Sequence, residues 1–120
     1  MVNSIFSSFP NSFETVETFS DLSAISCDPA GMAWGLDNST LFFADGHTRN
    51  ITKCVYDAKK ADVSNCETIL NISDEVSETA TPGGLAVDEN NHIWVAVTDN
   101  VGAVVEVDPE TKSIISTIGE

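Results

Sequence analysis

The chain repeats itself with an offset of 53 residues. Residues 81–97 read TPGGLAVDENNHIWVAV, which predicts a loop, a short apolar strand, a polar turn and a second apolar strand. The same order of features occurs in residues 28–45, DPAGMAWGLDNSTLFFAD. The residues matched at this offset are Gly31, Met32 and Ala33 with Gly84, Leu85 and Ala86. A repeat of about 40 to 50 residues built from short strands is typical of β-propeller blades, because each four-stranded blade buries its faces only against its neighbours.

Alternating apolar residues and the turns between them predict two sets of four strands. The first set comprises Met32–Leu36, Leu41–Asp45, Ile51–Asp57 and Glu67–Ile72, and the second comprises Leu85–Val87, Ile93–Val97, Ala103–Asp108 and Ile114–Ile118. Two weaker strands are expected near Ser4–Ser7 and Glu14–Phe19. Trp34 and Trp94 lie at strand centres and are predicted to pack between blades. Since no segment keeps an apolar period of 3.6 residues, the fold class is all-β, with no helix longer than a turn.

The composition restricts the partners of the chain. Its 19 acidic and 5 basic residues give a net charge of −14, and such a surface repels the phosphate backbone of nucleic acids. The apolar runs are too short to span a bilayer. The N-terminal residues MVNSIFSSFPNSF lack the basic and continuous apolar regions of a secretory signal. We therefore expect neither a nucleic-acid partner nor a membrane partner.

Three stretches of the chain carry motifs of a known family. They read PAGMAWGLDNSTLFFADG, CVYDAKKADVSNCETIL and TPGGLAVDENNHIWVAVTDNVGAVVEVDPETKSI. In order, they resemble the PNG-x-AW, YD…G-x-ISN and PDG…LWVA…NGG patterns of the family of senescence marker protein 30 (regucalcin), gluconolactonases and luciferin-regenerating enzymes. The resemblance covers residues 25–118, and SIFSSFPNSFETVETF is similar to the family's preceding strand pair.

The resemblance implies a six-bladed propeller, of which this chain carries a single partial region. One four-stranded blade is expected at residues 31–72 and another at residues 84–118, with the end of a preceding blade at residues 1–30. The chain is then an arc of a propeller, not a closed ring, and its outer strands lack neighbours. Pairing of such strand edges would join two copies, so an edge-paired homo-oligomer is a candidate partner arrangement.

The resemblance also implies a divalent-metal site, for calcium or zinc, at the mouth of the central channel. In the family, a bound metal opens sugar lactones or related esters, because the cation polarises the lactone carbonyl while a carboxylate takes a proton from water. The family's metal ligands are a glutamate, expected upstream of Met1, the asparagine of PNG and the aspartate of PDG. The last two fall on Ala30 and Gly83, and the position of the general base also falls on Gly83.

Neither Ala30 nor Gly83 has a side-chain oxygen, so we expect no metal ligand, no catalytic residue and no resident cofactor at these positions. The TPGG loop would then keep only its turn, with Gly84 free to adopt a positive φ.

Four polar residues remain at the expected mouth of the channel. Asp45 and His47 lie between the second and third strands of the first set, and Asp99 and Asn100 lie at the same place in the second set. These residues are candidates for a weak oxygen-lined site that contacts a small sugar lactone-like ligand. The alternative is that Asp45 and Asn100 cap their own turns and that His47 faces solvent. The second histidine, His92, lies in a polar turn and carries less weight.

The cysteines show no metal-binding spacing. Cys54 and Cys66 would lie nearly opposite each other in a hairpin, which allows a cross-strand disulfide, and Cys27 is the third cysteine. Sequons at Asn38, Asn50 and Asn71 also hint at a secreted protein. Without a signal sequence in view, a cytoplasmic location with free thiols ranks slightly ahead of a secreted parent.

Three functional hypotheses follow. The preferred one is a truncated and catalytically impaired member of the propeller family, acting as a scaffold or binding module. The second is a calcium-dependent lactonase or esterase completed by a longer isoform or a partner chain, which must explain Ala30 and Gly83. The third is a non-functional fragment, which exposed blade flanks and aggregation would favour.

Overall fold

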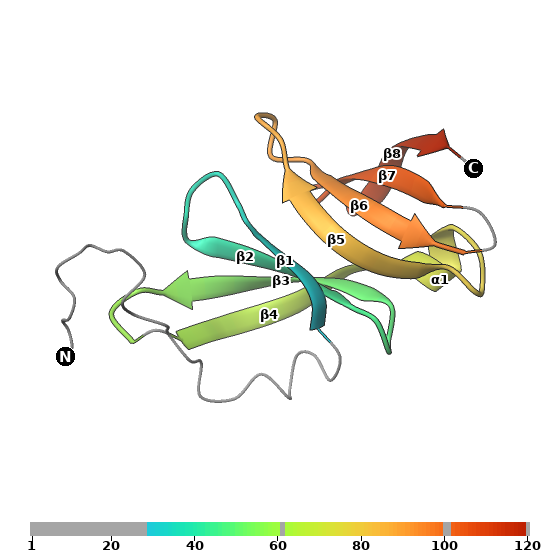
Figure 1. The fold of residues 1–120 in the computed structure, drawn as a ribbon. Helices are drawn as coiled ribbons and strands as arrows, with labels where there is room; N and C mark the ends of the chain where they lie inside the picture. Colours follow the sequence, from blue (N-terminus) through green and yellow to red (C-terminus); the bar gives the residue numbers. More distant parts are fainter. Residues whose placement is uncertain (1–28, 61, 100–101, 120) are drawn as a thin grey trace, which may run out of the picture.

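The computed structural model describes residues 29–60, 62–99 and 102–119. They form two four-stranded antiparallel sheets joined by one turn of helix (Figure 1). In each sheet the strands follow one another in sequence order. The first sheet contains β1 (Pro29–Trp34), β2 (Thr40–Asp45), β3 (Asn50–Asp57) and β4 (Asp62–Asn71). After α1 (Ile72–Glu75), the second sheet contains β5 (Thr81–Val87), β6 (Ile93–Thr98), β7 (Ala103–Asp108) and β8 (Ser113–Gly119).

The all-β class and the two sets of four strands are confirmed. The main difference in boundaries is β4, which begins five positions before the predicted Glu67, at Asp62. Residues that resembled a turn extend the hairpin instead, because Asp62 pairs with Asp57 and Val63 pairs with Tyr56. The strands predicted near residues 4–7 and 14–19, and almost all of the preceding blade, lie outside the described residues. Within the described part of the chain, no helix is long and apolar enough to cross a membrane.

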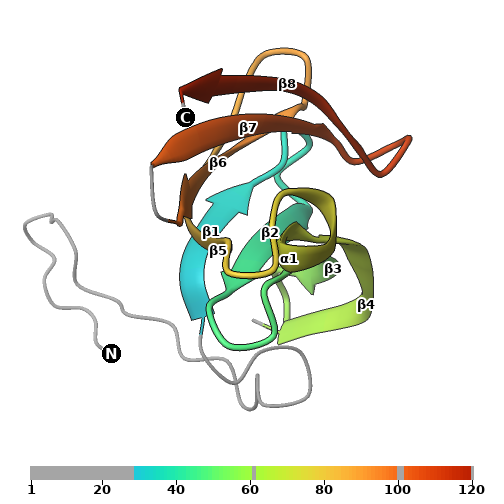
Figure 2. The same ribbon diagram turned by 90° about the vertical axis from the view of Figure 1, so that its right-hand side faces the viewer.

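The TPGG segment is not the turn that the sequence indicates. Its residues belong to β5, and Gly84 does not have a positive φ. Glycine is needed instead where the two innermost strands, β1 and β5, lie side by side (Figures 1 and 2). A Cβ atom on Gly31 would lie 2.4 Å from the carbonyl oxygen of Gly83. The close approach of two backbones therefore explains the glycine at position 31.

One apolar core joins the two sheets. It contains Phe42, Ala44, Ile51, Ile69, Leu70, Ile72, Ala80, Ile93, Val95, Val97, Val105 and Val107. A second, smaller cluster on the opposite face of the first sheet contains Leu41, Phe43 and Cys54. Trp34 does not pack between the sheets as predicted, since 45% of it is exposed and its ring meets Tyr56 edge-on at 5.0 Å. Alternation along β1 assigns Trp34 to one face, but this face is not the one that meets the second sheet.

We expect Gly31→Ala to lower the free energy of unfolding by about 1 to 3 kcal/mol. The added methyl group would meet backbone atoms of Gly83 and Gly84, which cannot rotate away as a side chain can. Gly84→Ala is the matched control, because nothing lies within 4 Å of its Cβ position. Urea unfolding should show the control unchanged or up to about 1 kcal/mol more stable. Equal effects of the two substitutions would contradict the close approach of β1 and β5.

Candidate functional site

The two innermost strands begin with the same irregularity. The pairing register shifts after Pro29 in β1 and after Pro82 in β5, so each strand carries one extra residue there. Such β-bulges redirect side chains and are common next to active sites. The positions that the resemblance assigns to metal ligands, Ala30 and Gly83, both lie in these bulges. The contact of Gly31 with Gly83 brings the two bulges together.

Asp45 lies beside the first bulge, paired with Pro29. It is only 2% exposed, and its Oδ1 accepts hydrogen bonds from the backbone amides of His47 at 2.7 Å and Thr48 at 3.0 Å. The side chain thus caps the turn between β2 and β3, which is the alternative that the sequence left open. His47 is exposed on that turn. These contacts give the Asp45 carboxylate a structural role in the β2–β3 turn.

Asp99 follows β6 at the corresponding place in the second sheet. Its carboxylate accepts hydrogen bonds from the hydroxyl groups of Ser77 and Thr79 and so ties the segment after α1 to the end of β6. Thr98 donates a hydrogen bond to the carbonyl oxygen of Thr81 across the hairpin. Asn100 lies outside the described residues. Among the described residues, the second sheet therefore presents hydroxyl groups and the Asp99 carboxylate at this end.

Cys54 on β3 and Cys66 on β4 are joined by a disulfide. Their Cα atoms are 4.1 Å apart, and Cys54 is fully buried. The structure thus has the cross-strand disulfide that the sequence allows, and not the free thiols that ranked slightly ahead of it.

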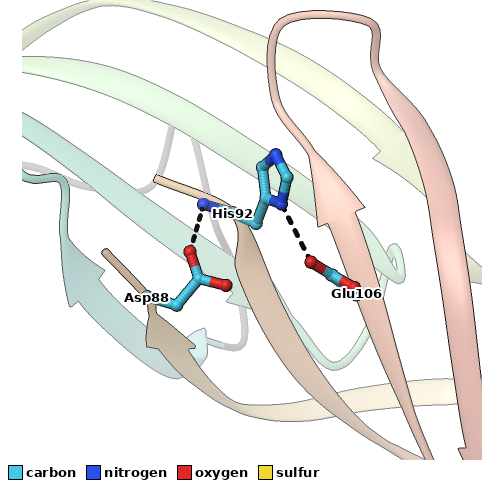
Figure 3. A group of neighbouring side chains, drawn as sticks. All are labelled: Asp88, His92 and Glu106. Carbon is cyan, nitrogen blue, oxygen red and sulfur yellow. Dashed lines mark hydrogen bonds and ion pairs between the residues drawn. The ribbon is translucent and has the colours of Figure 1, made fainter. Parts of the chain in front are cut away.

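A group of side chains around His92, which was expected to carry less weight than His47, lies at the other end of the second sheet. His92 precedes β6, Asp88 follows β5, and Glu106 lies on β7; their side chains converge (Figure 3). One ligand atom from each residue lies within 4.8 Å of the other two. His92 Nδ1 is 2.9 Å from Glu106 Oε2, and His92 Nε2 is 4.0 Å from Asp108 Oδ2. This group combines an imidazole with carboxylates, which is the chemistry of a transition-metal site.

Neighbouring donors hold both carboxylates of this group in place. The indole Nε1–H of Trp94 donates to Asp88 Oδ2 at 2.9 Å, and the hydroxyl of Ser116 donates to Glu106 Oε1 at 2.8 Å. The hydrogen bond from Trp94 is the main reason that the pKa of Asp88 is lowered. The hydrogen bond with Glu106 is the main reason that the pKa of His92 is raised. Both shifts favour the charged forms, an ionised Asp88 and a protonated His92.

Strand register explains why these residues meet. Trp94 pairs with Glu106, which pairs with Ser116, so all three project from one face of the second sheet. His92 lies two residues before Trp94 and shares its face. The turn that contains His92 is at the end of β5 opposite Thr81, because Thr81 pairs with Thr98 whereas Val87 pairs with Ile93. The group is therefore separate from the bulges that contain Ala30 and Gly83.

Comparison with known proteins agrees with the fold and the motifs. The family model for the SMP-30/Gluconolactonase/LRE-like region matches residues 14–118. The chain belongs to this family. The two sheets are two blades of a partial β-propeller.

The chain spans less than a third of the length of the relatives that it matches. Regucalcin of Xenopus laevis is 32% identical over 88 residues, which cover 73% of this chain and 28% of regucalcin. A luciferin-regenerating enzyme has a TM-score of 0.68 at 22% identity, covering 77% of this chain and 30% of its own. A gluconolactonase from Xanthomonas campestris has a TM-score of 0.59 at 20% identity, covering 76% and 27%. At these sequence identities, similarity to the solved structures supports a shared fold and nothing more.

Proposed function

We propose that this chain is a propeller scaffold that has lost the mouth metal site of its family and does not hydrolyse lactones by itself. The observation that carries the proposal is the pair of bulges at the start of β1 and β5. Each strand has a backbone irregularity of the kind that redirects a side chain, and the residues there are Ala30 and Gly83.

The residues at these bulges do not fit a divalent cation. Calcium requires 6 to 8 oxygen ligands, and zinc requires nitrogen, sulfur or carboxylate ligands. Ala30 offers no side-chain donor, and Gly83 offers only backbone. Of the polar groups nearby, the Asp45 carboxylate caps the β2–β3 turn and the Asp99 carboxylate binds the hydroxyl groups of Ser77 and Thr79. What remains at this end suits binding of a hydroxylated ligand such as a sugar lactone better than metal-assisted hydrolysis.

The test is a lactone hydrolysis assay with and without calcium, zinc or manganese. We expect no metal-dependent turnover from the folded chain, because no side chain at the bulges polarises a carbonyl through a metal. Turnover that is lost on chelation would contradict the proposal and favour a lactonase with other ligands, starting with Asp45 and Asp99.

A gain-of-binding variant sharpens this test. Ala30→Asn with Gly83→Asp restores two of the oxygen ligands that the resemblance implies. Gly83 tolerates a side chain, since its Cβ position is 3.6 Å from the nearest backbone oxygen and its φ is not positive. We expect calcium affinity to rise by at least about tenfold, because ligand number and charge set calcium affinity. The control, Ala30→Asn with Gly84→Asp, adds the same charge at the neighbouring position and should leave the affinity unchanged.

A further part of the proposal concerns partners. Met32 on β1 and Ile118 on β8 are 55% and 58% exposed, so the outer faces of the pair of sheets keep apolar surface. Pairing of two copies through β4 or β8, each of which pairs with one strand in the described sheets, would continue these faces from one copy into the other. Light scattering gives the oligomeric state directly: a dimer supports edge pairing, and a monomer at the concentrations used for the binding assays contradicts it.

A further inference from the structure

We propose that Asp88, His92 and Glu106 form a binding site for a divalent transition-metal ion of the zinc class, separate from the mouth of the propeller. The three residues come from the β5–β6 turn and from β7, on the face of the second sheet that points away from the first. This proposal does not depend on the loss of the mouth site, because none of its residues lies in either bulge.

The spacing of the ligand atoms supports a four-coordinate ion. Zinc binds nitrogen and carboxylate oxygen at about 2.0 to 2.2 Å, which places neighbouring ligand atoms about 3.3 Å apart in a tetrahedron. His92 Nδ1 and Glu106 Oε2 are 2.9 Å apart, and the third ligand atom lies within 4.8 Å of both. To admit the ion, His92 Nδ1 and Glu106 Oε2 would separate by about 0.4 Å, and the Asp88 oxygen would approach them by up to about 1.5 Å. Three protein ligands leave the fourth position to water.

The surroundings resemble those of metal sites that are held in place by a second layer of contacts. Trp94 and Ser116 each donate to one oxygen of a ligand carboxylate, and the backbone amides of Asn90 and His92 donate to Asp88 Oδ1 at 2.8 and 3.0 Å. When His92 binds the ion through Nδ1, its Nε2 lies 4.0 Å from Asp108 Oδ2, a carboxylate on the far side of the ligating imidazole.

The types of ligand select the class of ion. An imidazole nitrogen suits zinc and its neighbours better than calcium or magnesium, which prefer oxygen. The side chains of His92 and Glu106 are 25% and 16% exposed, so the ion reaches them from solvent while little water surrounds them. Since the net charge of −14 attracts every cation weakly, selectivity for zinc over calcium is the property that identifies a built site.

The experiment is calorimetric titration of the whole chain with zinc and, separately, with calcium. Cys27→Ser serves as the background, because a thiolate outside the disulfide would also bind zinc. We expect one zinc ion per chain and at least tenfold weaker calcium binding. His92→Asn should weaken zinc binding by more than about 100-fold, since even residues behind a ligand contribute 10- to 100-fold.

Matched substitutions separate the site from general charge. His47→Asn removes the other histidine, and Glu110→Gln removes the same charge as Glu106→Gln from a nearby turn; both controls should bind zinc like the parent. Circular dichroism checks that each variant is folded. If His92→Asn does not fold, Asp88→Asn replaces it in the zinc titration. Urea unfolding of the parent with and without zinc then gives a second measure of binding. No zinc binding by the parent, or equal binding by the His92 and His47 variants, overturns the proposal and leaves a hydrogen-bonded surface network only.

Discussion

Phe42→Ala is expected to lower the free energy of unfolding by about 3 to 5 kcal/mol, because it opens a cavity in the core that joins the two blades. Phe42 is 1% exposed and belongs to the cluster that contains Val95 and Val105 of the second sheet. Its strand, β2, lies against β5. Urea unfolding followed by circular dichroism measures the change, which is a large share of the 5 to 15 kcal/mol typical of a small domain.

The control for this prediction is Val55→Ala on the neighbouring strand β3. Val55 is 42% exposed, so its loss should change stability by no more than about 0.5 kcal/mol. If both substitutions cost the same small amount, the two blades do not share a core, and the arc is held together only by the chain connection. If Phe42→Ala alone is costly, burial between blades stabilises the arc.

Much of the fold could be predicted because its signals are local. Alternation of apolar residues and polar turns placed β6 within one residue of its observed ends and β7 at both of its ends. The errors fall where contacts between the strands and sheets decide which residues join a strand and which face is covered. β1 and β5 begin at segments rich in proline and glycine, which local rules assign to loops, yet bulges admit them to the sheet. Likewise, alternation divides β1 into two faces but does not say which face a neighbour covers, and this is why Trp34 was misplaced.

The candidate sites could be predicted only in part, for a related reason. Asp45 acts within its own turn, so its capping role follows from the sequence. The group around His92 depends on Glu106, 14 positions away, which the pairing of β6 with β7 brings into place. A signal was nevertheless present. Once the two strands are aligned about their turn, Glu106 lies opposite Trp94, on the face that His92 shares.

Removal of the disulfide is the second prediction with a large effect. Cys54→Ser with Cys66→Ser is expected to lower the free energy of unfolding by about 3 kcal/mol in the chain-entropy estimate for a loop of this size. The two cysteines are 12 positions apart and join β3 to β4, which is the strand pair with the most paired residues in the first sheet. Urea unfolding measures the loss, and Cys27→Ser is the control because it removes a thiol without removing the bridge.

Thiol labelling under denaturing, non-reducing conditions gives an independent result. One labelled cysteine per chain is expected, at Cys27, and three after reduction. Three without reduction would contradict the bridge and return the chain to the expectation of free thiols.

The outcome also bears on where the protein works. A bridge that resists glutathione and contributes about 3 kcal/mol would fit an oxidising compartment, since structural disulfides are rare in reducing cytosol. In such a compartment Asn38 is the sequon to examine first, because it is exposed on the β1–β2 turn. The side-chain amide of Asn71 instead donates to the carbonyl oxygen of Thr48 and to Asn50 Oδ1, and its own Oδ1 accepts from the backbone amide of Asp74. The asparagines of the other two sequons are therefore engaged where α1 begins. If the bridge is easily reduced and its loss costs little, the buried Cys54 contributes as a small apolar residue in the second cluster, and a cytoplasmic scaffold becomes the better account.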